Sequence, residues 1–147
     1  MTHYYRYYVL VMLTVVSMIN IMDRLILSIL LEDIKAEFTF TDTQLGVLAG
    51  LAFALFYALM SIPIARWADI SNRKNILAAA LIIWSGMTAL CGAATGFVSL
   101  FLARLGVGIG EAGGSPPSYS IIADYFKPSE RARAMGVYVT GSVLGTG

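Results

Sequence analysis

The chain has 147 residues, of which 58% are hydrophobic and 13% charged, and its formal net charge is +1. An average soluble domain is about half apolar and a quarter charged, so this composition excludes that class and predicts an integral membrane protein. The near-neutral charge, without a Lys/Arg cluster interleaved with aromatic residues, argues against a nucleic-acid partner. Cys91 is the single cysteine, which excludes a disulfide framework or a thiolate metal site within one chain.

Apolar stretches follow one another along the chain, and each must be helical where it meets lipid, because an open chain can satisfy its backbone there only as a helix. The predicted spans are 7–31, 45–65, 76–94, 98–126 and 134–147, the last of which is truncated. The predicted fold is therefore an all-α integral membrane protein with four full transmembrane helices and the start of a fifth.

Polar and turn-forming residues separate the spans. Thr41 and Gln44 have the spacing of a capping box at the start of the second helix. The run of glycine and proline at 113–117 should kink the fourth helix. Residues 32–42 are expected to form a solvated loop or a short surface helix, and residues 127–133 a charged loop.

The Lys and Arg residues between the spans predict the orientation, because cytoplasmic loops carry an excess of them. With the amino terminus in the cytoplasm, the inner side receives seven: Arg6, Arg66, Arg73, Lys74, Lys127, Arg131 and Arg133. The outer side receives only Lys35. We expect a multi-pass protein with a cytoplasmic amino terminus, most simply in a bacterial inner membrane.

Asp23 and Arg24 stand side by side inside the first apolar stretch. Charges within a membrane span are costly and mark functional sites by default. The alternative, that this pair ends a shorter span at the membrane surface, has to account for six further Leu and Ile residues between 25 and 31.

The fourth span carries two more charges, Arg104 and Glu111, on one helix face. A rise of about 1.5 Å per residue puts Asp23 and Arg24 roughly 11 Å below the outer surface, Arg104 roughly 9 Å and Glu111 roughly 20 Å. Side chains lean toward the amino end of their helix, which lowers the guanidinium of Arg24 toward the level of Glu111. If spans one and four are neighbours, Asp23 can therefore pair with Arg104 and Arg24 with Glu111. A buried acid takes up a proton when its arginine moves away, so Asp23 and Glu111 are candidate proton-coupling residues, with a purely structural ion pair as the alternative.

Gly106, Gly110 and Gly114 form a stripe at the spacing that lets two membrane helices pack closely. The overlapping pattern G-x-G-x-x-G at 108–113 is rejected as a dinucleotide site, because no strand or βαβ unit surrounds it. No serine has a histidine base, and His3 is the only histidine. The sequence therefore predicts neither an enzyme nor a cofactor or metal site.

Residues 65–74, A-R-W-A-D-I-S-N-R-K, resemble the signature G-x-L-A-D-R-x-G-R-K between helices two and three of the major facilitator superfamily. The matching residues are Asp69, Arg73 and Lys74. Further runs are similar to the Spinster-type lipid transporters of that superfamily: N-x-x-D-R at 20–24, T-D-T-Q-L-G at 41–46, W-S at 84–85 and R-x-x-x-G-x-G-E-A at 104–112.

This resemblance implies a twelve-helix fold in two halves, with spans one and four adjacent at a central cavity. It implies proton-coupled movement of amphipathic substrates such as lysophospholipids or sphingoid phosphates, with Asp23, Arg24 and Glu111 in coupling and headgroup contact. It also implies a cytoplasmic gate at Asp69, Arg73 and Lys74. Alternating access needs both halves, so we expect an amino-terminal fragment whose partner is the absent carboxy-terminal half.

Two alternatives stay open. In an organic anion or sugar-acid symporter of the same superfamily, Arg24 and Arg104 could hold a substrate carboxylate. A small four-helix membrane scaffold would explain the length without truncation, but it would not explain four buried charges at matching depths.

Overall fold

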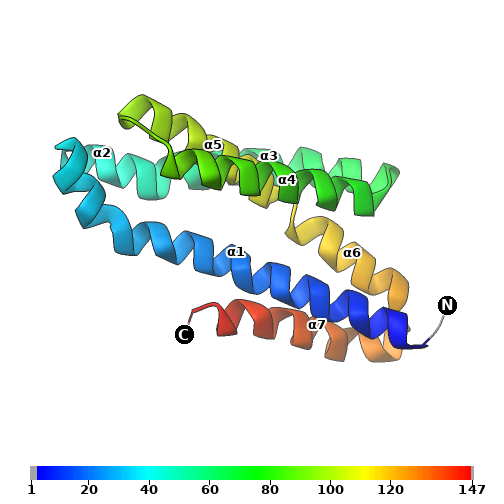
Figure 1. The fold of residues 1–147 in the computed structure, drawn as a ribbon. Coiled ribbons are helices and arrows are strands. Elements are labelled where there is room, and N and C mark those ends of the chain that lie inside the picture. Colours follow the sequence, from blue (N-terminus) through cyan, green and yellow to red (C-terminus); the bar gives the residue numbers. More distant parts are fainter. Residues whose placement is uncertain (1–2, 147) are drawn as a thin grey trace.

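The computed structural model describes residues 3–146, and every regular element in that range is a helix (Figure 1). In chain order the elements are α1 (His3–Phe38), α2 (Asp42–Gly46), the π-helix η1 (Val47–Leu51), α3 (Ala52–Ile70), α4 (Arg73–Gly92), α5 (Phe97–Ala112), α6 (Ser115–Tyr125) and α7 (Pro128–Leu144).

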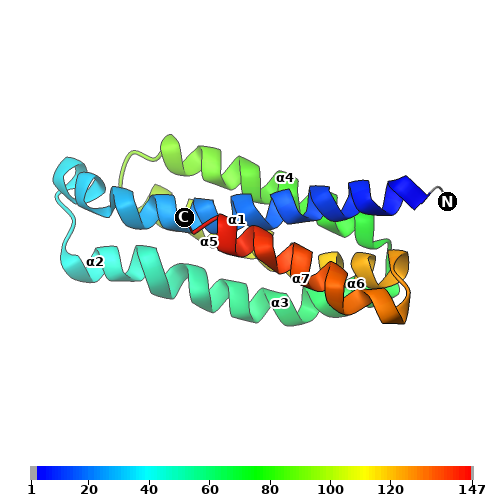
Figure 2. The ribbon, with the colours of Figure 1, turned by 90° about the horizontal axis from the view of Figure 1, so that it is seen from below.

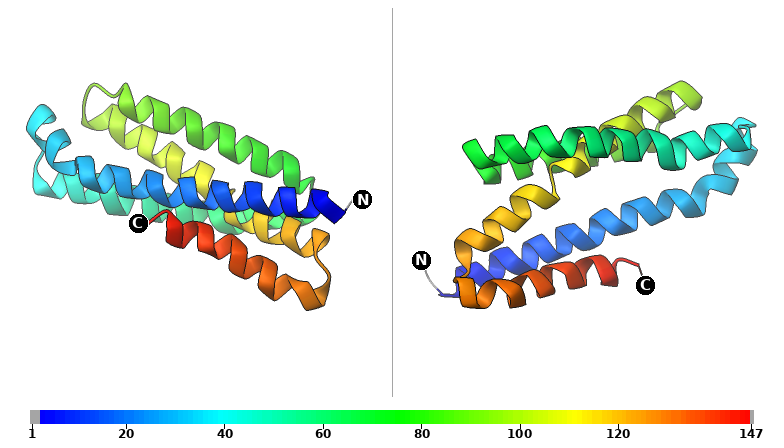
Figure 3. Two further views of the ribbon diagram at one scale, coloured as in Figure 1. Left: turned by 60° about the horizontal axis from the view of Figure 1, so that its bottom comes forward. Right: turned by 180° about the vertical axis from the view of Figure 1, so that it is seen from behind.

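The helices form two layers. One layer holds α3, α4 and α5, the other holds α1 and α7, and α6 crosses from the first to the second (Figures 1 and 3). In the second layer α7 packs along α1 and runs parallel to it (Figure 2). We call the end where α1 begins, α3 joins α4 and α6 joins α7 the N-terminal end of the bundle, and the other the opposite end.

Four segments are long and apolar enough to cross a membrane: Tyr4–Phe38, Asp42–Ile70, Arg73–Gly92 and Phe97–Tyr125. They correspond to the four full spans expected from the sequence. The prediction of an all-α membrane fold is confirmed.

Several helix boundaries differ from the predicted ones. The first helix continues to Phe38, so most of residues 32–42 extend it. The expected charged loop at 127–133 is wrong, because α7 begins at Pro128. Proline is favoured in the first turn of a helix, where its missing N–H costs no hydrogen bond, and charged residues are compatible with a helix that emerges from the membrane.

Of two predicted local motifs, the capping box is present and the kink is replaced by a break. Thr41 caps α2 by accepting from the amide of Gln44 at 3.3 Å, and the Gln44 side chain accepts from the amide of Thr41 at 2.9 Å. The fourth span breaks at 113–114, between α5 and α6. Both prolines that follow lie in the first turns of α6, so they start a new helix instead of kinking a continuous one.

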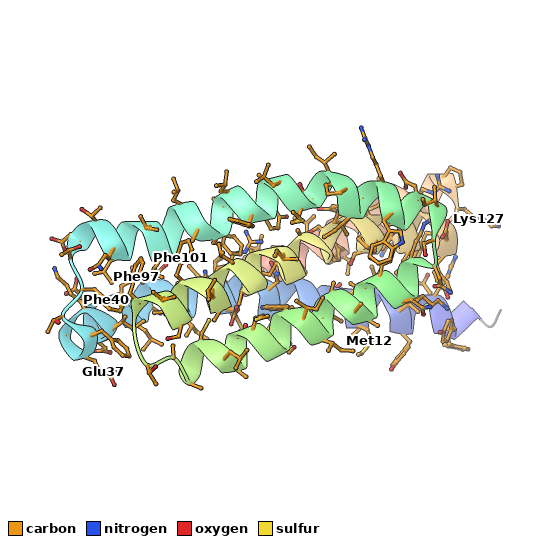
Figure 4. The ribbon with its side chains drawn as sticks, turned by 90° about the horizontal axis from the view of Figure 1, so that it is seen from above. Met12, Glu37, Phe40, Phe97, Phe101 and Lys127 are labelled. Carbon is orange, nitrogen blue, oxygen red and sulfur yellow. The ribbon has the colours of Figure 1, made fainter. Side chains whose placement is uncertain are left out.

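Apolar side chains pack in separate clusters along the bundle. Phe40, Phe97 and Phe101 lie together at the opposite end (Figure 4), where Phe40 meets Phe97 edge to face with ring centroids 5.7 Å apart. Midway along the bundle, Phe53, Trp84 and Val107 join α3, α4 and α5. The guanidinium groups of Arg24 and Arg104 lie against the Phe53 ring of this middle cluster.

Close approach of α5 to α4 depends on glycine. A methyl group at Gly110 would lie 2.6 Å from the backbone nitrogen of Trp84, and one at Gly106 would lie 2.5 Å from the Met87 side chain. The packing expected at Gly114 is not seen, since its nearest atom would be the carbonyl oxygen of Glu111, and Gly113 instead faces Ala80 at 2.6 Å. Because the helix breaks at 113–114, the third glycine of the stripe that packs against α4 is Gly113 instead of Gly114.

Candidate functional site

Arg24 of α1 and Glu111 of α5 form an ion pair between the two layers. The Arg24 Nε donates to Glu111 Oε2 at 2.7 Å. The Glu111 side chain is 0% exposed, and its other oxygen, Oε1, is buried without a hydrogen-bond partner. The site therefore holds a carboxylate with one oxygen bonded and one oxygen free to accept a further group.

Aromatic rings from α3 surround the arginine. The Arg24 guanidinium lies 4.7 Å from the ring centroid of Phe53 and 5.0 Å from that of Tyr57. Such cation–π contacts attract the charge electrostatically to the faces of the rings. Because the Arg24 side chain is still 33% exposed, the guanidinium can reach a ligand without leaving these rings.

The ion pair borders a cavity of about 150 Å³ between the two layers. Besides Arg24 and Glu111, its polar lining consists of Ser17, Asn20, Tyr57, Trp84, Ser115, Tyr119, Tyr138 and Ser142. Two of these hydroxyls bond each other across the cavity wall, Ser17 of α1 and Ser142 of α7, at 2.7 Å. The cavity, which we call the central cavity, is thus lined by both layers and by hydrogen-bonding groups.

Asp23 does not take the partner that was expected for it. Its Oδ2 accepts from the Trp84 Nε1 at 3.1 Å and from the Thr88 hydroxyl at 3.2 Å, both on α4. Successive residues of a helix point about 100° apart, so Asp23 and Arg24 could not both face α5. Thr88 was not singled out from the sequence, and Trp84 entered only in the W-S run of the family resemblance, without a partner, because depth along a helix does not specify the face.

Arg104 is buried on α5 with only 4% of its surface exposed. Its Nε has no hydrogen-bond partner, its guanidinium lies 5.2 Å from the Phe53 ring, and among residues 3–146 no ion pair joins it to Asp23. Both residues border a second cavity of about 380 Å³ toward the opposite end of the bundle. We call it the outer cavity; it brings Asp23 and Arg104 to one space without pairing them.

Comparison with known proteins places this arrangement in a family. The model of the Major Facilitator Superfamily matches residues 13–147. The chain belongs to the Major Facilitator Superfamily. Together with the apolar helices, this makes it an integral, multi-pass membrane protein, and the family and fold are those of transporters rather than enzymes.

A solved structure of this superfamily, a bacterial homolog to the human lysosomal transporter Spinster in an inward-facing and unoccupied conformation, superimposes with a TM-score of 0.94 and 48% identity. The match covers 99% of this chain and 30% of that chain, which confirms the resemblance to Spinster-type transporters.

Two curated relatives also bear the names of transport proteins. An MFS-type efflux pump of Mycolicibacterium smegmatis is 37% identical over 92% of this chain and 33% of its own length. A D-galactonate transporter of Escherichia coli is 34% identical over 95% of this chain and 32% of its own length. The present chain thus spans about a third of the relatives it matches.

The residues that match the superfamily signature lie at the N-terminal end of the bundle. Arg73 pairs with Asp124 of α6, and the Lys74 ammonium lies 5.8 Å from the Tyr125 ring. Asp69 is exposed and has no ion pair within the part of the chain that the structure describes. Of the three predicted gate residues, two therefore contact α6 and one faces outward.

Proposed function

We propose that the protein is a proton-coupled secondary transporter that moves amphipathic, lipid-like anions by alternating access. Lysophospholipids and sphingoid phosphates are the substrates with the right chemistry, a charged headgroup on an apolar chain. The 147 residues would supply the amino-terminal wall of the substrate path, and a facing carboxy-terminal half would supply the other.

The observation that carries this proposal is that only one of the two carboxylate oxygens of Glu111 has a hydrogen-bond partner. Its Oε2 depends on Arg24 and its Oε1 has no partner, in a site with no exposure of the side chain. A substrate anion that drew Arg24 away would leave a buried, unpaired carboxylate, which is costly in an apolar environment. Uptake of a proton by Glu111 would remove that cost, so substrate binding and proton binding become linked.

The other charged residues have roles in the same scheme. Asp23 would be a second proton-coupling group, and Arg24 and Arg104 would contact the substrate headgroup together with Glu111. Asp69, Arg73 and Lys74 would form the cytoplasmic gate, in which the Arg73–Asp124 pair fixes the start of α4 to the end of α6. The amino terminus would lie in the cytoplasm of a bacterial cell.

A second candidate function is the symport of organic anions or sugar acids. It is favoured by the 34% identity to a D-galactonate transporter, and two arginines near one ring could hold a carboxylate as well as a phosphate. The apolar outer cavity of about 380 Å³ and the higher identity to the Spinster homolog favour the lipid-like substrate.

The test is uptake by the full-length protein in proteoliposomes with an imposed pH gradient. Glu111→Gln keeps the shape of the side chain and removes the titrating group, so gradient-driven uptake should fall to the level of empty vesicles while substrate exchange at equal pH persists. Glu32→Gln, the same change at an exposed carboxylate, is the control. Normal gradient-driven uptake by Glu111→Gln would contradict the proposal.

The same vesicles separate the two substrate classes. Radiolabelled lysophospholipid and radiolabelled galactonate are offered under one gradient. Accumulation of the lysophospholipid alone supports the first function, and accumulation of galactonate alone replaces it by the second.

A further inference from the structure

We infer that Trp84 and Thr88 of α4 are positioning residues that hold the carboxylate of Asp23 in place for transport. The inference deepens the proposed function, since it rests on Asp23 taking part in it. Trp84 stands in the W-S run of the family resemblance without an assigned role, Thr88 lies in none of the quoted motifs, and neither residue carries a charge.

The geometry is that of a dedicated acceptor site. Both donors reach the same oxygen, Oδ2, at 3.1 Å from the Trp84 indole and 3.2 Å from the Thr88 hydroxyl. Residues four apart lie on one face of a helix, so the two donors form a vertical pair facing α1. Trp84 is only 6% exposed, which means that its indole N–H depends on this partner.

The Thr88 hydroxyl departs from the usual behaviour of threonine in a helix. Such hydroxyls commonly bond the carbonyl four residues back, as Thr14 does with Leu10 at 2.8 Å and Thr140 with Gly136 at 2.9 Å. Thr88 instead bonds across to another helix. Its rotamer therefore serves the carboxylate of Asp23 rather than the backbone of α4.

Neutral donors are the partners that Asp23 has in this structure. Arg104 borders the same outer cavity, yet no ion pair joins it to Asp23 within residues 3–146. The position of the carboxylate consequently depends on α4 and not on an arginine. The Arg24–Glu111 pair sets the rotation of α1, and the two donors on α4 fix where the carboxylate of Asp23 lies within that arrangement.

Trp84 also packs against the residue that precedes the second acid of the site. Its backbone lies against Gly110, where an added methyl group would come within 2.6 Å of the Trp84 nitrogen, and Gly110 precedes Glu111. Trp84 is also one of the residues that line the central cavity. A displacement of α4 along α5 would thus move the support of Asp23 and the backbone beside Glu111 together.

The first test compares variants of the full-length transporter in the uptake assay. Thr88→Val keeps the shape and removes the hydroxyl, and we expect gradient-driven uptake to fall about tenfold, the effect of losing one hydrogen bond to a charged group. Thr88→Ser restores the donor and should restore most of the uptake. Thr140→Val, which removes a hydroxyl bonded only to its own helix, should leave uptake unchanged. Equal uptake by Thr88→Val and the unmodified protein would overturn the inference.

The second test does not depend on transport. Full-length protein labelled with 5-fluorotryptophan gives a fluorine NMR signal for Trp84, identified by its loss in Trp84→Phe. Asp23→Asn and Thr88→Val should both shift that signal, while the signal of exposed Trp67 stays in place. A Trp84 signal unaffected by Asp23→Asn would refute the contact, whereas failure of the Glu111→Gln experiment would refute only the proposed transport mechanism.

Discussion

Arg24 forms an ion pair and also packs against aromatic rings, and the two kinds of contact together hold its guanidinium between α5 and α3. The pair to Glu111 is 2.7 Å long, and the rings of Phe53 and Tyr57 lie within 5.0 Å of the guanidinium. Removing the arginine would leave the buried carboxylate without its charge partner. Breaking a buried pair in this way costs more than replacing both partners.

This difference can be measured. Arg24→Met retains the length of the side chain, and we expect it to lower the free energy of unfolding in mixed detergent–SDS micelles by about 1–3 kcal/mol, the cost of an unsatisfied buried polar group. The double variant Arg24→Met/Glu111→Gln should recover part of that loss. Arg66→Met, at an exposed arginine, is the matched control. A double variant less stable than Arg24→Met alone would contradict this account of the pair.

The buried charges show where sequence reasoning succeeds at the scale of single residues and where it fails. Three premises predicted the pair of Arg24 with Glu111: the height of each residue along its helix, the lean of side chains toward the amino end of a helix, and the adjacency of spans one and four that the family resemblance implies. These premises were not sufficient for Asp23, whose direction around the helix decides between α4 and α5. Only the packing of a third helix fixes that direction, and the donors on α4 are neutral residues without a charge pattern to reveal them.

At the scale of elements, the contact between α4 and α5 is closest where α5 has glycine. The backbone of Trp84 leaves no room for a side chain at Gly110, whereas the Met87 side chain at Gly106 can move. Gly86 of α4 has open space around it. These three positions form a graded series within one helix pair.

Substitution by alanine should follow that grading. Gly110→Ala has to separate two backbones, and we expect it to cost about 1–3 kcal/mol of unfolding free energy, as overpacking does. Gly106→Ala should cost less, because a flexible side chain yields. Gly86→Ala should stabilise the helix by roughly 0.5–1 kcal/mol, since alanine restricts the unfolded chain. The measurement is the same unfolding assay; a Gly110→Ala variant as stable as Gly86→Ala would show that α4 and α5 are not held at this distance.

Helices and their caps were largely predictable, and their exact junctions were not. Apolar length indicated the spans, and the Thr41–Gln44 box and the break at 113–114 follow from local chemistry. The start of α7 at Pro128 was missed because charge was read as a sign of a loop, although proline at the first helical position is itself a start signal. Charged residues indicate that a segment is exposed to solvent, but they do not indicate whether its backbone is helical.

At the scale of the whole molecule, an ion pair at the N-terminal end joins the first helix to the last. Arg6 of α1 donates to both carboxylate oxygens of Glu130 in α7, at 2.8 and 3.3 Å. Its guanidinium also lies 5.3 Å from the ring of Phe126, and the Arg131 Nε donates to the Phe126 carbonyl oxygen. The connection between α6 and α7 is therefore fixed to the start of α1, which holds the second layer together at this end.

The Arg6–Glu130 pair predicts that the stability of the folded protein falls as the pH falls. The hydrogen bonds from Arg6 lower the pKa of Glu130 below its ordinary value of 4.5. A carboxyl whose pKa is lowered by folding stabilises the folded state above the unfolded pKa, and it loses that contribution as the pH falls through the folded pKa.

Glu130→Gln should therefore melt at a lower temperature than the unmodified protein at pH 7, and this difference in melting temperature should close below pH 4.5. The thermal melts are recorded in detergent at both pH values, with Glu32→Gln, the same change at an exposed carboxylate, measured beside it for comparison. A gap that stayed constant from pH 7 to below pH 4.5 would mean that the charge of Glu130 does not bind α7 to α1.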